Sequence, residues 1–137
     1  MVNRWLALAV VVLGAAGCAA EPPTTPLKAA HLTLDGTTHT TRPAMCSQMQ
    51  SYKTIDIPFP SGRAEAAVLL SGDRVIPQWV KIGNIDGFTG SFWQGGVGSA
   101  RADVSNRTYT VTGSAYGINR SQPNKTVTTD FKIVAEC

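Results

Sequence analysis

The sequence has little charge, few aromatic rings and almost no histidine. Of its 137 residues, 15% are charged, 7% are aromatic and two are histidines. At roughly 100–200 residues per domain, a chain of this length forms one domain at most, which excludes a multidomain enzyme. The formal net charge of +3 is too small for a strongly basic nucleic-acid binder, so no nucleic-acid partner is expected. The apolar runs are too short and too few for a polytopic membrane protein.

Motifs of catalysis and of metal binding are also missing. The chain has no Gly-x-Ser-x-Gly elbow of a hydrolase and no Cys-x-x-Cys pair. The run Gly95–Gly98 lacks the Lys-Ser/Thr pair and the helix of a phosphate-binding loop, so a turn is expected there. We therefore expect a protein that is not an enzyme, with no catalytic residue and no cofactor.

The two histidines do not suggest a metal site either. Asp35-Gly36 between two β-prone runs predicts a hairpin with a two-residue turn. In that register Leu32 opposes His39 and His31 opposes the following threonine. Neighbouring residues of a strand point to opposite faces, so His31 and His39 diverge and no metal is expected.

The N-terminal segment has the pattern of an export signal. Arg4 supplies a positive charge, and the apolar run Trp5–Ala16 follows it. The sequence Ala15-Ala16-Gly17-Cys18 then resembles a bacterial lipobox, although the pattern prefers Leu, Val or Ile where Ala15 stands. We expect residues 1–17 to form a helical lipoprotein signal peptide, and Cys18 to carry the lipid. The alternative is an ordinary signal peptide that is cut near Ala16–Ala20.

Residues 18–29 are expected to be the lipidated cysteine and a short tether. The stretch Glu21–Pro26 contains three prolines, which favour an extended spacer. Thr24 and Thr25 beside these prolines are candidate O-glycosylation sites, with a bare linker as the alternative. The protein would then be exported and held by its lipid on the outer face of the cell membrane or further out in the envelope.

The three cysteines predict one disulfide. If Cys18 carries lipid, Cys46 and Cys137 remain, and a pair of cysteines in an exported chain is typically oxidised. This bond would close almost the whole domain. The alternative, a metal or catalytic role for Cys46 or Cys137, finds no supporting spacing.

Short alternating segments over residues 30–137 predict a mainly β domain, an antiparallel sandwich or barrel-like sheet that allows one short helix. The clearest strand is the last one, where Val127, Thr129, Phe131, Ile133 and Ala135 share one face. Residues 64–70 fit a helix or a strand. Residues 74–82 contain a proline, which predicts an edge strand or a break.

The few aromatic residues are the best candidates for a ligand pocket. Trp79, Phe88, Phe92 and Trp93 lie close together in the sequence. In a small β domain such rings more often belong to the core. If the domain carries a small apolar or lipid ligand, these four side chains are expected to line its site.

The motifs of the domain also carry a family likeness. Over residues 32–137 the sequence resembles the mycobacterial 19-kilodalton lipoprotein antigen family, the LpqH-like proteins. The matching motifs are Leu34-Asp35-Gly36, Cys46, Gly83–Gly87, Tyr109–Gly117, Phe131–Ile133 and the terminal Cys137. The tether is shorter than in the founding antigen, which suggests a paralogue. The resemblance implies a non-enzymatic envelope lipoprotein with an antigenic surface role, acyl chains that engage host Toll-like receptors, and a carrier role as the alternative.

Overall fold

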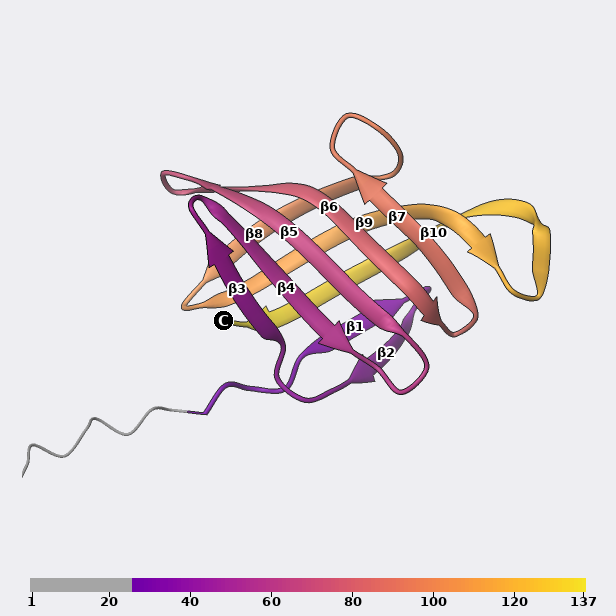
Figure 1. The fold of residues 1–137 in the computed structure, drawn as a ribbon, viewed down its shortest axis with the longest axis horizontal. Coiled ribbons are helices and arrows are strands. Elements are labelled where there is room, and N and C mark those ends of the chain that lie inside the picture. The colour runs from indigo at the N-terminus through magenta and orange to yellow at the C-terminus, as the bar shows by residue number, and fades with distance from the viewer. Residues whose placement is uncertain (1–25) are drawn as a thin grey trace, which may run out of the picture.

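The structure is a computed structural model that describes residues 26–137 (Figure 1). The predicted signal peptide, Cys18, Thr24 and Thr25 lie outside the described residues. The described part contains ten strands and no helix, so the mainly β prediction is confirmed. The strands are β1 (His31–Leu34), β2 (Thr37–Thr40), β3 (Met45–Met49), β4 (Tyr52–Pro58), β5 (Arg63–Ser71), β6 (Arg74–Ile85), β7 (Phe88–Trp93), β8 (Ser99–Ser105), β9 (Thr108–Asn119) and β10 (Gln122–Glu136).

All ten strands belong to one open antiparallel sheet. Its order is β2-β1-β10-β9-β7-β6-β5-β4-β3, and β8 pairs with β9 beside this path. Two strands pair with the same edge of β9: β8 with residues 108–114 and β7 with residues 116–119. The sheet divides at this point into two layers. In Figure 1, β3–β7 cross in front of β8, β9, β10, β1 and β2.

The core lies between the two layers. Its largest fully buried side chains come from both layers and are almost all β-branched, the residue type that packs best on a pleated surface. They are Leu32, Ile55, Ile57, Val68, Val80, Ile82, Ile85, Val111 and Ile133. Residues 26–137 contain no helix that is long and apolar enough to cross a membrane.

The first hairpin has the predicted register. Leu32 pairs with His39 and His31 pairs with Thr40. Asp35 and Gly36 both have positive φ, at 48° and 80°, as the favoured two-residue turn requires. The alternation along β10 is also confirmed, since Phe131, Ile133 and Ala135 are buried while the residues between them are more exposed.

The strand pairings decide between the alternatives that the sequence left open for two segments. Residues 64–70 belong to β5, because both of its neighbours, β4 and β6, offer backbone partners along this stretch. β6 lies inside the sheet rather than at its edge, so the edge prediction was wrong. The predicted break is present, because Val68 pairs with Pro77 and Ala67 with Trp79, which leaves Gln78 as an extra residue.

Candidate functional site

The described chain enters the sheet at one fixed point. Ala30 is fully buried, and its carbonyl oxygen accepts a hydrogen bond of 2.9 Å from the N–H of Thr41. Residues 26–29 precede this point and leave the domain beside the beginning of β3 (Figure 1). An anchor attached upstream would therefore be connected to β1, a strand that is hydrogen-bonded on both sides, to β2 and to β10.

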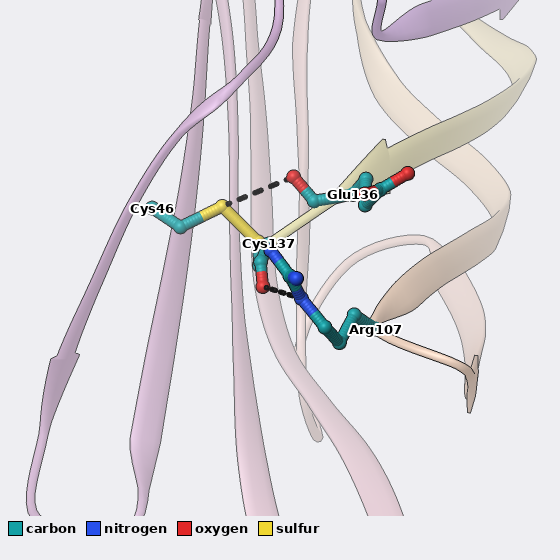
Figure 2. The surroundings of a disulfide bond; sticks show 4 residues. All are labelled: Cys46, Arg107, Glu136 and Cys137. Carbon is teal, nitrogen blue, oxygen red and sulfur yellow. Dashed lines mark hydrogen bonds between the residues drawn. A yellow bond between two sulfur atoms is a disulfide. The ribbon is translucent and has the colours of Figure 1, made fainter. Parts of the chain in front are cut away.

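The predicted disulfide between Cys46 and Cys137 is present in the structure (Figure 2). Cys46 of β3 is bonded to Cys137, which follows β10, across a separation of 91 residues and a Cα–Cα distance of 5.8 Å. The bond joins the outermost strand of one layer to the end of a strand of the other layer. It therefore holds the two layers together where the sheet itself is open.

The C-terminal residue is also held by the turn between β8 and β9. Cys137 donates its N–H to the carbonyl oxygen of Arg107 at 2.9 Å. In return, Arg107 Nε donates to the carbonyl oxygen of Cys137 at 3.2 Å (Figure 2). The sulfur of Cys46 lies 3.8 Å from the Glu136 carbonyl oxygen. Since a disulfide sulfur carries no hydrogen, this is a packing contact. The end of the chain is thus fixed by two neighbouring elements, β3 and the turn between β8 and β9.

The four aromatic residues proposed for a pocket divide between two faces. Phe88 and Phe92 are buried in the core. Trp79 pairs with Trp93 on the opposite face of β6 and β7, and Trp93 is 43% exposed. The structure therefore does not gather the four side chains around one cavity.

The tryptophan pair has a charged neighbour that the sequence analysis did not single out. The Lys81 ammonium lies 4.7 Å from the ring centroid of Trp79 and 5.2 Å from that of Trp93. The two indoles are 6.2 Å apart and tilted by 36°. The spacing Trp79-x-Lys81 on a strand places both side chains on one face, and this was the available signal.

The histidines lie apart, as the hairpin register predicted. His31 Nδ1 is 3.0 Å from the Thr40 hydroxyl. His39 Nε2 lies 2.7 Å from Asp86 Oδ2 in the turn before β7, and the ring meets Phe59 edge-on at 5.9 Å. The described residues contain no group of three metal-ligating side chains. The His39–Asp86 pair instead links the edge strand β2 to the other layer.

A hollow of about 570 Å³ lies beside this pair, between β2 and the turn after β4. It is lined by Thr38, His39, Thr40, Thr41, Arg42, Pro58, Phe59 and Pro60. None of the four predicted pocket residues contributes to it. Sequence reasoning missed this hollow because it depends on how two strands distant in the chain approach each other.

Comparison with known proteins identifies the relatives of this chain. A family model described as Mycobacterium 19 kDa lipoprotein antigen matches residues 23–137. Lipoprotein LppE of Mycobacterium tuberculosis is 63% identical over 128 residues, which cover 93% of this chain and 91% of LppE. A chain named as a lipoprotein in Mycobacterium indicus pranii is 32% identical over 139 residues and spans the whole of both sequences. Lipoprotein LpqH of Mycobacterium avium is 34% identical over 73 residues, 53% of this chain and 45% of LpqH.

These relatives are named as lipoproteins, and none of the names describes an enzyme. The family match extends through both cysteines of the disulfide and all ten strands. This chain is a lipoprotein of the mycobacterial 19 kDa lipoprotein antigen family.

Proposed function

We propose that the protein is an envelope lipoprotein that displays its β domain outside the cell membrane and acts by binding rather than by catalysis. The observation that carries the proposal is Cys18, which follows small residues at the end of an apolar segment in a chain whose relatives are named as lipoproteins. A diacylglycerol thioether on Cys18 and an acyl group on the new amine would supply the several chains that stable anchoring requires.

The disulfide supports this placement. Disulfides form and persist in exported proteins and are rare in the cytosol. The Cys46–Cys137 bond is therefore the chemistry expected of a domain that matures outside the cytoplasm.

Partition into detergent tests the anchor. The full chain expressed in a mycobacterial host should enter the detergent phase, and Cys18→Ser should move to the aqueous phase because it lacks the thiol that accepts lipid. Ala15→Leu, which restores the preferred residue of the lipobox, is the matched control and should stay with the detergent. Wild-type protein in the aqueous phase would contradict the proposal.

Host Toll-like receptors are the partner that the family resemblance implies for the acyl chains. If the lipid is what these receptors bind, wild-type protein should activate a receptor reporter cell and Cys18→Ser should lose that activity. Equal signalling by both proteins would exclude the acyl chains as the ligand.

Carriage of a small apolar or lipid ligand is a second candidate, favoured by the hollow beside Phe59. Native mass spectrometry of the purified protein should then show a bound molecule, and Phe59→Asp should lose it because a carboxylate replaces the apolar wall. A spectrum without added mass would reject the carrier function.

A further inference from the structure

The outer face of the β3–β7 layer carries a second apolar surface, separate from the core. Paired residues of antiparallel strands point to the same face. Met49 pairs with Tyr52, Tyr52 with Leu69, and Leu69 with Ile76. In the next row Ala67 pairs with Trp79, and Trp79 pairs with Trp93. We call this surface the outer apolar band; its members are Met49, Tyr52, Ala67, Leu69, Ile76, Trp79 and Trp93.

The band points away from the core. The core cluster contains the alternating neighbours Ala66, Val68 and Val80 but no member of the band, of which Ala67 alone is buried, at 4% exposure. Met49 is 79% exposed, Tyr52 47% and Trp93 43%. Contiguous exposed apolar surface on a small domain marks a contact site for a partner or a membrane.

The composition of the band fits a lipid surface. Tryptophan and tyrosine have an apolar ring and one polar group, and they are enriched at the level of lipid headgroups. Lys81 lies over both indoles, and within residues 26–137 its ammonium forms no ion pair. A lysine stem along apolar surface with a free ammonium is the arrangement that reaches a lipid phosphate.

The same composition disfavours a carbohydrate as the ligand of the outer apolar band. A carbohydrate site needs hydrogen-bonding side chains between the aromatic rings. The band instead has Ala67, Leu69 and Ile76 between Tyr52 and the tryptophans. Aliphatic side chains match the boundary between headgroups and acyl chains.

The chain upstream is long enough to let this face reach the membrane. Eleven residues separate Cys18 from Ala30, where the sheet begins. Their extended length is at most about 36–40 Å, comparable with the length of a 12-residue strand such as β6 at about 40 Å. A tether this short holds the domain at an effective concentration in the millimolar range, so even weak docking would be populated.

We infer that the outer apolar band docks on the lipid surface to which the protein is anchored, with Trp79 and Trp93 at the headgroup level and Lys81 directed to lipid phosphates. The inference rests on the proposed anchor at Cys18. It adds the orientation of the β domain on the membrane, in which the opposite layer and the hollow beside Phe59 remain open to solvent.

Tryptophan fluorescence tests the docking directly. The chain has three tryptophans, and Trp5 belongs to the predicted signal peptide, so Trp79 and Trp93 supply the emission of the mature protein. Membrane-purified protein is reconstituted into vesicles of phosphatidylglycerol and phosphatidylcholine with brominated acyl chains. Emission should fall by about half relative to unbrominated vesicles, because indoles at the headgroup level lie near the upper acyl carbons.

Two variants with the same added charge separate docking from general charge effects. Ile76→Glu places a carboxylate in the half-buried centre of the band and should abolish the quenching. Thr112→Glu places one on the exposed face of β9 in the other layer and should be quenched like wild type. Far-ultraviolet circular dichroism should confirm that both variants keep the sheet.

The outcomes distinguish the docking from the anchor. Detergent partition without quenching overturns the docking and leaves the anchor standing, and a dimer by sedimentation would then assign the band to a second copy of the chain. Quenching in protein that stays in the aqueous phase, with vesicles added, overturns the anchor and supports the docking. Quenching of Ile76→Glu equal to wild type also overturns the docking.

Discussion

At the scale of single residues, two glycines determine how closely β7 and β9 approach. Gly90 pairs with Gly117 where the sheet divides into its two layers. A Cβ atom on Gly117 would collide with the carbonyl oxygen of Thr89. The absence of side chains here lets one strand turn sharply from one layer to the other.

Gly117→Ala should lower the free energy of unfolding by about 1–3 kcal/mol, the usual cost of overpacking. Gly83→Ala on β6 is the matched control, since its nearest atom would be 3.7 Å away. The control should leave stability unchanged or raise it by up to about 1 kcal/mol. Urea unfolding midpoints measure both, and equal midpoints would show that the strand crossing tolerates a methyl group.

At the scale of elements, β10 connects the first hairpin to the rest of the sheet. It pairs with β1 on one side and β9 on the other. Its inward residues Phe131, Ile133 and Ala135 are buried, while Lys132 between them is exposed. One strand therefore contributes both to the core and to the continuity of the sheet.

Ile133→Ala should reduce the free energy of unfolding by about 2–5 kcal/mol, because it removes buried methyl groups and leaves a cavity. Lys132→Ala, one position away, should change it by no more than about 0.5 kcal/mol. Thermal and urea unfolding give both values. A larger loss for Lys132→Ala would mean that the two faces of β10 are assigned the wrong way round.

Sequence reasoning succeeded for elements with one apolar face. The Asp35-Gly36 hairpin and β10 alternate cleanly, so the period of two gave both the strand and its inward side. β5 could not be assigned because its segment is apolar on both faces. Its outward Ala67 and Leu69 belong to the outer apolar band, and its inward Ala66 and Val68 belong to the core.

The four residues of the predicted pocket were grouped because they are close in the sequence, and this closeness does not show on which face of the sheet each side chain lies. Adjacency in sequence grouped Phe92 with Trp93, although neighbouring residues of a strand point to opposite faces. Only the pairing of β6 with β7 brings Trp79, Lys81 and Trp93 together. The bulge at Gln78 completes this arrangement, because it returns Trp79 to the outer face after Pro77.

At the scale of the whole molecule, the two layers are held together by links far apart in sequence. The Cys46–Cys137 bond closes one region, and the His39–Asp86 pair links the edge strand β2 to the turn before β7. His39 and Asp86 are both partly exposed, so solvent screens their attraction and the pair adds little stability. The covalent bond is the stronger of the two links.

The double variant Cys46→Ser, Cys137→Ser should lose about 4–5 kcal/mol of unfolding free energy, the chain-entropy estimate for a loop of this length. Reductant should lower the unfolding midpoint of the wild-type protein to that of the double variant and leave the double variant unaffected. A wild-type midpoint that does not respond to reductant, with full reduction verified by thiol titration, would show that the bond is not needed for stability.

The intact mass of the protein purified from mycobacterial membranes tests the lipid anchor most directly. We predict the mass of the chain from Cys18 to Cys137, increased by a diacylglyceryl group and an amide-linked acyl chain and reduced by the two hydrogens of one disulfide. The mass of an unmodified chain that begins after Cys18 would contradict the anchor.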